Sequence, residues 1–175
     1  EYASWPTGPG LVSVSGPEGG LATYQLREDR LPARGDQVFY TAGQISGAGH
    51  EIIVSESGGT THVFATGFSH NGILRYTLGT GGDLGGRTVL RGADIGAAPA
   101  VAAATADGEL FLADPGQSGF SVHGIGGSGL TGGYTVADTA STHADAIGAT
   151  ATARIGSTDI VIIGSQSEHG VTAYT

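Results

Sequence analysis

Four segments of this sequence share one pattern of apolar and polar positions. Each has an apolar run, then a small polar turn that ends in a glycine, then a second short apolar run; the clearest copy is DIVIIGSQSEHGVTAYT at residues 159–175. The glycines that mark the four copies are Gly20, Gly72, Gly119 and Gly170. They are spaced 52, 47 and 51 residues apart, so the pattern predicts a repeat protein.

Fixed positions around these glycines carry similar side chains. The residue after the glycine is apolar in every copy: Leu21, Ile73, Phe120 and Val171. The fourth residue after it is an aromatic ring: Tyr24, Tyr76, His123 and Tyr174. We expect the three tyrosines to pack between neighbouring units, because large aromatic side chains are usually buried.

Short runs of β-branched and aromatic residues between glycine-rich turns predict four strands per repeat. The expected strands are 11–15, 21–26, 37–42 and 50–55, then 61–66, 73–78, 87–90 and 100–105, then 109–113, 120–125, 134–137 and 149–155, and last 159–163 and 171–174. The charged stretch 27–36 is expected to be a solvated turn, since Pro32 and Gly35 bracket it. No window shows sustained helical periodicity.

Four short strands per unit and a period near 50 residues are typical of a β-propeller blade, with a β-sandwich or a β-helix as the other all-β folds. The fourteen expected strands make about three and a half four-stranded blades, half of a seven-bladed ring. We therefore expect an N-terminal arm over residues 1–9 and a partial β-propeller over residues 10–175. Its blade units would lie at about 10–56, 61–106, 108–156 and 158–175.

An open half-ring would expose an apolar blade face and a strand edge, so something must close it. Because the pattern stops inside a repeat and the sequence has no methionine, we expect a segment whose ring is closed by the remainder of a longer propeller chain. The alternative is a second copy, since two such chains would supply 28 strands, or seven blades of four.

Composition restricts the partners and the compartment. Sixteen carboxylates stand against seven arginines and no lysine, a net charge of −9 that argues against nucleic acid as a partner. No apolar run approaches the 18 residues of a membrane span. The absence of cysteine excludes disulfides and thiolate metal sites. An acidic composition without lysine or cysteine is common in secreted bacterial proteins, so we expect an extracellular or cell-surface location.

Three residues are candidates for binding. His70 and His169 occupy equivalent turns, SHNG and SEHG, and would line the same rim on different blades, although descent from one ancestral repeat explains them as well. Trp5 is the only tryptophan and could be a ligand platform or a lid over the edge of the core.

The segment with His143 and Asp145 (THAD), together with Asp138, is the candidate metal or acid–base cluster, and a solvated loop is the competing interpretation. Other motifs carry no chemistry. GIGGSG at 124–129 matches a dinucleotide fingerprint as a string, but it joins two expected strands and is interpreted as a β-turn. His50 and Glu51 begin like a zinc-protease motif, but Val54 stands where the second histidine is needed.

The unit of an apolar strand, a polar turn and G-apolar-x-x-Tyr-x-Leu, as in GLATYQL at 20–26 and GILRYTL at 72–78, resembles lactonase-like (YVTN-type) seven-bladed β-propeller repeats. Such repeats also occur in large secreted alphaproteobacterial hemolysin-type calcium-binding proteins. The resemblance covers residues 10–175 and implies a fold more than an activity. Ca²⁺ binding has no motif here, because GGSGLT at 126–131 lacks the aspartate of a calcium nonapeptide.

Two functions are compatible with these features. The first is a non-catalytic secreted or cell-surface propeller module that mediates binding or assembly with a glycan or protein partner. The alternative, implied by the resemblance alone, is a metal-dependent lactone-ring hydrolase in which a divalent cation polarises the ester carbonyl.

Overall fold

A computed structural model describes residues 2–4, 11–16, 20–27, 30–39, 52–66, 72–91, 101–104, 107–113, 118–127 and 129–175. Within these residues the fold is all-β, as expected, and contains no helix. Accordingly, none of the described segments is a helix of the length and apolarity needed to cross a membrane.

Fifteen strands form four antiparallel sheets, and in each sheet neighbouring strands are consecutive in the chain. Sheet I contains β1 (Tyr2–Ser4), β2 (Leu11–Gly16), β3 (Gly20–Arg27) and β4 (Arg30–Phe39). Sheet II contains β5 (Ile52–Ser57), β6 (Thr60–Ala65), β7 (Gly72–Leu78) and β8 (Leu84–Arg91). Sheet III contains β9 (Val101–Ala104), β10 (Glu109–Ala113), β11 (Phe120–Ile125) and β12 (Leu130–Val136). Sheet IV contains β13 (Ile147–Ile155), β14 (Thr158–Ser165) and β15 (Gly170–Tyr174).

The sheets group the strands differently from the expected blade units. The strands expected to end the units at 10–56, 61–106 and 108–156 are β5, β9 and β13, and each is instead the first strand of the following sheet. The expected N-terminal arm, residues 1–9, contains β1, which pairs with β2 and so begins sheet I. The described residues therefore form three four-stranded sheets and one three-stranded sheet, rather than three blades and an isolated hairpin.

The charged stretch 27–36 is largely strand rather than turn. Arg27 ends β3, Arg30 begins β4, and the two residues face each other across a tight hairpin. Pro32 and Gly35 are accommodated because β4 is an outermost strand, where a missing N–H breaks no ladder, and because the β3–β4 register shifts twice. The turn at 124–129 is confirmed, since Gly126 and Gly129 exchange backbone hydrogen bonds.

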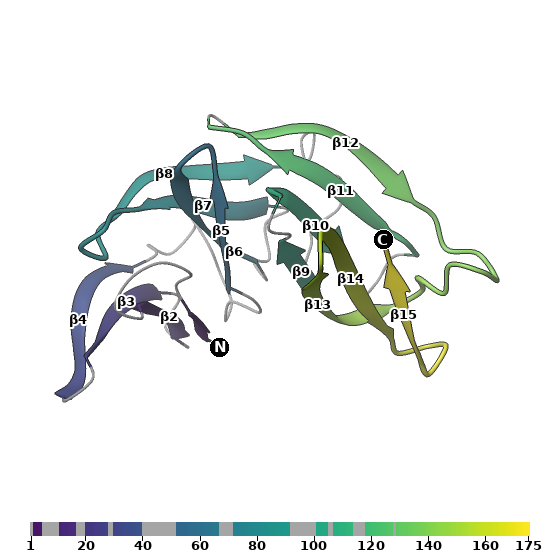
Figure 1. The fold of residues 1–175 in the computed structure, drawn as a ribbon, viewed down its shortest axis with the longest axis horizontal. Coiled ribbons are helices and arrows are strands. Elements are labelled where there is room, and N and C mark those ends of the chain that lie inside the picture. Colours follow the sequence, from purple (N-terminus) through teal and green to yellow (C-terminus); the bar gives the residue numbers. More distant parts are fainter. Residues whose placement is uncertain are drawn as a thin grey trace.

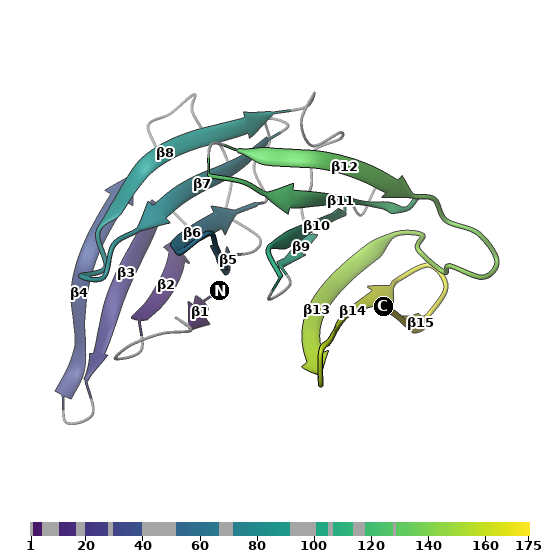
Figure 2. The ribbon, with the colours of Figure 1, turned by 45° about the horizontal axis from the view of Figure 1, so that its top comes forward.

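The sheets form an open arc, with sheets I and IV at its two ends (Figure 1). The first strands lie along the inside of the arc, β1 beside β5, β5 beside β9 and β9 beside β13. The last strands, β4, β8 and β12, lie on the outside (Figure 2).

An apolar cluster fills each junction between neighbouring sheets. Leu21 of sheet I packs with Val63 and Tyr76 of sheet II. Two further clusters join sheet II to sheet III and sheet III to sheet IV. The middle strands of sheets II and III, β6, β7, β10 and β11, are consequently covered on both faces, which explains their nearly continuous apolar runs.

The marker glycines occupy corresponding places in the four sheets. Gly20, Gly72 and Gly170 are the first residues of β3, β7 and β15, and Gly119 directly precedes β11. The expected packing of tyrosines is confirmed for Tyr76, and for Tyr174, whose ring meets that of Phe120 edge-on at a centroid distance of 5.1 Å. Tyr76 and Tyr174 therefore each face the sheet that precedes their own.

Candidate functional site

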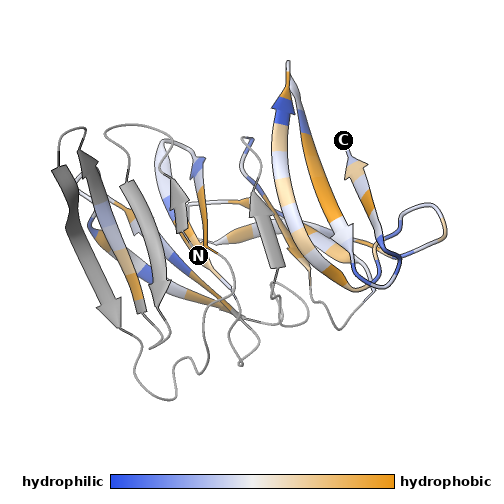
Figure 3. Ribbon diagram, turned by 90° about the horizontal axis from the view of Figure 1, so that it is seen from below, coloured by the Kyte–Doolittle hydropathy of each residue, from blue (hydrophilic) through white to orange (hydrophobic). Residues whose placement is uncertain are grey.

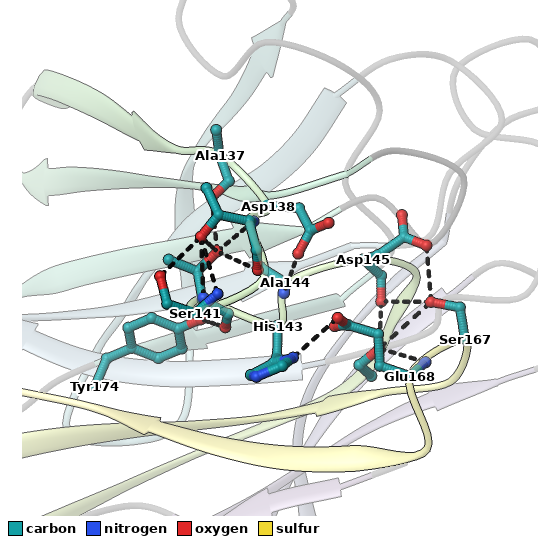
Figure 4. Close-up of polar contacts among 12 residues, drawn as sticks. Ala137, Asp138, Ser141, His143, Ala144, Asp145, Ser167, Glu168 and Tyr174 are labelled. Carbon is teal, nitrogen blue, oxygen red and sulfur yellow. Dashed lines mark hydrogen bonds and ion pairs between the residues drawn. The ribbon is translucent and has the colours of Figure 1, made fainter.

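Two segments next to sheet IV lie side by side and form a network of polar contacts (Figure 4). They are the loop 137–146, which precedes β13, and the turn 166–169, which joins β14 to β15; we call them the seam. Ile147 of β13 pairs with Ser165 of β14 in antiparallel register. The residues just before Ile147 therefore lie beside the residues just after Ser165. The backbone N–H of Gln166 accordingly donates to the carbonyl of Ala146.

Asp145 connects the seam to sheet III. Its Oδ1 accepts a hydrogen bond of 2.6 Å from the Ser118 hydroxyl, and its Oδ2 accepts one of 2.7 Å from the Ser167 hydroxyl. These two bonds, with a smaller contribution from the backbone of Ala146, hold the pKa of the Asp145 carboxyl below its ordinary value. The Asp145 carbonyl accepts a third bond, of 2.6 Å, from the Ser165 hydroxyl.

The rest of the seam is held in a similar way. Asp138 Oδ1 accepts the backbone N–H of Ala144 at 2.7 Å, and His143 Nδ1 lies 3.0 Å from Glu168 Oε1. The Tyr174 hydroxyl donates to the Thr142 carbonyl. Burial raises the pKa of Tyr174, and the charges of Asp138 and Glu168 add to the effect.

Backbone strain is concentrated in the seam. His143, Ala146 and His169 have φ of 49°, 46° and 52°, and they are the non-glycine residues with positive φ in the described part of the chain. Each costs on the order of 1–3 kcal/mol, so such residues persist where the surroundings hold them firmly. Hydrogen bonds at Asp138, Asp145 and Ser165 supply that restraint.

The candidate metal residues Asp138, His143 and Asp145 lie near one another but bond to different partners. Among the described residues no three histidine, aspartate or glutamate side chains form a group that could hold a metal ion. His169 is exposed in the β14–β15 turn, whereas His70 and Trp5 lie outside the described residues. Metal-dependent lactone hydrolysis therefore stays a prediction from the resemblance.

The sequence interpretation missed Ser118, Ser167 and Glu168. The sequence did contain a signal for Ser167 and Glu168. A hairpin that turns at residues 156–157 pairs Ile147 with Ser165, so the end of the loop before β13 lies close to the turn after β14. Nothing in the sequence indicated Ser118, which lies two residues before β11 of sheet III and meets Asp145 through an isolated bridge between the two backbones.

The pKa of Asp145 predicts how stability depends on pH. A carboxyl whose pKa is lower in the folded state stabilises the fold above the pKa of the unfolded chain, about 4, and loses that contribution as pH falls through the folded pKa. The unfolding temperature of wild type should therefore exceed that of Asp145→Asn at pH 7, and the difference should shrink below about pH 4. Thermal unfolding followed by circular dichroism between pH 7 and 2 measures it.

A Ser167→Ala variant is the matched control, because it removes one of the two hydroxyl donors and should show part of the same pH dependence. If the difference in unfolding temperature between wild type and Asp145→Asn stays constant down to pH 2, the charge of Asp145 does not stabilise the seam.

Hydrogen bonds of the seam connect sheet IV to sheet III, and His143 and His169 are exposed at the surface of the seam. An exposed histidine–glutamate pair can form hydrogen bonds with a polar ligand. No protein-family model matches this chain, and no match was found among curated proteins or solved structures.

Proposed function

We propose that this chain is a non-catalytic β-propeller module, secreted or displayed at the cell surface, that acts by binding or assembly with a protein or glycan partner. Support comes from the radial order of the sheets, each packed on the next with its first strand on the inside, as in propeller blades. The proposal of assembly rests on one observation, the character of the face of sheet IV that is directed away from sheet III.

That face is apolar. Val161 and Ile163 of β14 pack against sheet III, so the residues that alternate with them lie on the opposite face. The cross-strand register places Ala151 and Ala173 beside Ile162 there, and Ala153 beside Ile160. Figure 3 shows these strands, in the sheet that carries the C-terminus, with apolar residues along them at one end of the molecule.

The repeat indicates what should cover this face. The residue after the marker glycine points to the next sheet: Leu21, Ile73 and Phe120 are 0 %, 0 % and 5 % exposed. Its counterpart in sheet IV, Val171, is 76 % exposed. A further sheet of the same kind would bury Val171 as the earlier ones are buried. Such a sheet could come from the rest of a longer propeller chain or from a second copy.

Substituting Val171 tests this. The wild-type chain should associate in solution, and Val171→Asp should weaken the association at least about tenfold, because a carboxylate would then be buried in an apolar contact. Sedimentation velocity over a range of protein concentrations, with native mass spectrometry, measures it. A discrete dimer would identify a second copy as the covering sheet, and larger species dispersed by Val171→Asp would indicate an open-ended contact.

The matched control is Thr135→Asp, which places the same charge on an exposed residue of β12. It should leave the mass distribution unchanged. A wild-type chain that stays monomeric at every concentration, and whose Val171→Asp variant behaves identically, would remove the support for assembly through this face.

A further inference from the structure

Three polar side chains are buried between sheets II and III. Ser55 of β5, His62 of β6 and Arg75 of β7 are at most 5 % exposed. Ser55 is paired with His62, and Arg75 is paired with Phe64 two residues further along β6. Phe64 belongs to the cluster that joins sheet II to sheet III, so all three polar residues lie on that same face. Arg75 Nη1 donates to the carbonyl of Gly126, in the turn after β11, at 3.1 Å.

These side chains have hydrogen-bonding groups that no atom of the described residues satisfies. Ser55 Oγ, both ring nitrogens of His62 and Arg75 Nε are buried and have no partner in the described structure. Roughly nine in ten buried polar atoms in proteins do have one. Four such atoms on one face of one sheet therefore point to a ligand that bonds to them.

The charge of Arg75 narrows the class of ligand. A guanidinium stays protonated at any ordinary pH. The ion pairs of the described residues lie elsewhere, at Arg154 and at His143, and none includes Arg75. Water can satisfy a donor but cannot neutralise a charge, and a buried charge without a counter-charge is strongly unfavourable. An anion would supply both.

The donors suit an oxyanion. A guanidinium N–H, a hydroxyl and an imidazole N–H can each donate to one oxygen atom of a carboxylate, phosphate or similar group. Burial, and then the charge of Arg75, lower the pKa of His62, so its ring is neutral and offers one donor. The turn contacted by Arg75 lies at the surface, where Gly126 is half-buried and Gly127 is exposed.

We propose that Ser55, His62 and Arg75 form an internal binding site for a small oxyanion, held between sheets II and III. The site is independent of the association proposed for sheet IV, which lies beyond sheet III. A bound oxyanion would neutralise Arg75 and join two sheets through polar contacts, so it would stabilise this junction.

The probes are sodium formate and sodium phosphate, each compared with sodium chloride at equal ionic strength and pH 7. At least one of the two should raise the unfolding temperature with a saturable dependence on concentration, by about 5–10 °C at a hundred times its dissociation constant. Arg75→Met, which keeps an unbranched apolar chain but removes the guanidinium group, should lose this increment. Arg87→Met, at an exposed arginine of the same sheet, should retain it.

A second measurement keeps the proposal testable if Arg75→Met unfolds. The imidazole of His62 is followed by NMR during a pH titration with and without the probe, and the signal is assigned by its loss in His62→Gln. A bound anion should raise the pKa of His62, since it favours the protonated ring. Equal effects of chloride, formate and phosphate on stability, together with an unchanged His62 titration, would overturn the proposal and leave water as the occupant.

Discussion

Replacing Phe64 with alanine is expected to lower the free energy of unfolding by about 3–5 kcal/mol, the usual loss for removing a core phenylalanine. Phe64 is fully buried on β6 and packs with Ile73 of sheet II and Leu110 of sheet III. Its removal opens a cavity at a junction between sheets, where backbones fixed by ladder hydrogen bonds on both sides can collapse only slightly. Because domains of this size are stable by only about 5–15 kcal/mol, the loss is a large fraction of the total.

Urea unfolding followed by circular dichroism measures the effect, and the midpoint should fall while the dependence on urea stays constant. Tyr134→Ala is the control, since it also truncates an aromatic side chain but at an exposed position of β12. It should change the free energy of unfolding by about 0.5 kcal/mol or less. Equal losses in the two variants would show that sheets II and III are not packed through Phe64.

Gly119→Ala is expected to lower the free energy of unfolding by an amount comparable to that of Phe64→Ala, because of the backbone conformation at Gly119. Gly119 has a φ of +97°, which side chains strongly disfavour. A Cβ there would lie 2.3 Å from the Val136 carbonyl oxygen. Neither Gly119 nor Val136 can move away freely. The Gly119 N–H donates to the Ala144 carbonyl at 2.7 Å, and Val136 is paired with Phe120. Roughly 1–3 kcal/mol of strain and a similar amount from overpacking give a loss of about 2–6 kcal/mol.

The matched control is Gly170→Ala, at the equivalent position of the repeat in sheet IV. A Cβ on Gly170 meets its nearest atom, the Glu168 carbonyl oxygen, at an ordinary 3.8 Å. Thermal unfolding of both variants should show a large decrease for Gly119→Ala and little change for Gly170→Ala. Equal behaviour would mean that the Val136 carbonyl does not lie against Gly119 in solution.

The strands were predictable because their signal is local. A short run of β-branched and aromatic residues between turn residues predicts a strand whatever packs against it, so segments such as THVFAT and DIVII could be identified without knowing their neighbours. The ends of the outermost strands were less accurate. β4 and β12 begin several residues before their expected starts, since an outermost strand is half-solvated and tolerates the glycine, proline and charged residues that otherwise indicate a turn.

The candidate site was predictable only in part. Asp138, His143 and Asp145 were found because they are close in sequence, and they do lie in one loop. Their partners decide what they do, and these come from other strands. Ser118 is 27 residues from Asp145, and Glu168 is 25 residues from His143. Those contacts make the loop a joint between sheets III and IV.

The sequence by itself determined the period of the repeat, the hairpin at each marker glycine and the apolar residue that follows it. It could not determine where each sheet begins, because a periodic pattern gives the number of residues in a unit but does not show which strand is the first of a sheet. The tertiary structure decided this through hydrogen bonding, which joins β5, β9 and β13 to the strands that follow them. Burial was decided in the same way: Val171 and Phe120 occupy equal positions, yet only Phe120 has a neighbouring sheet to cover it.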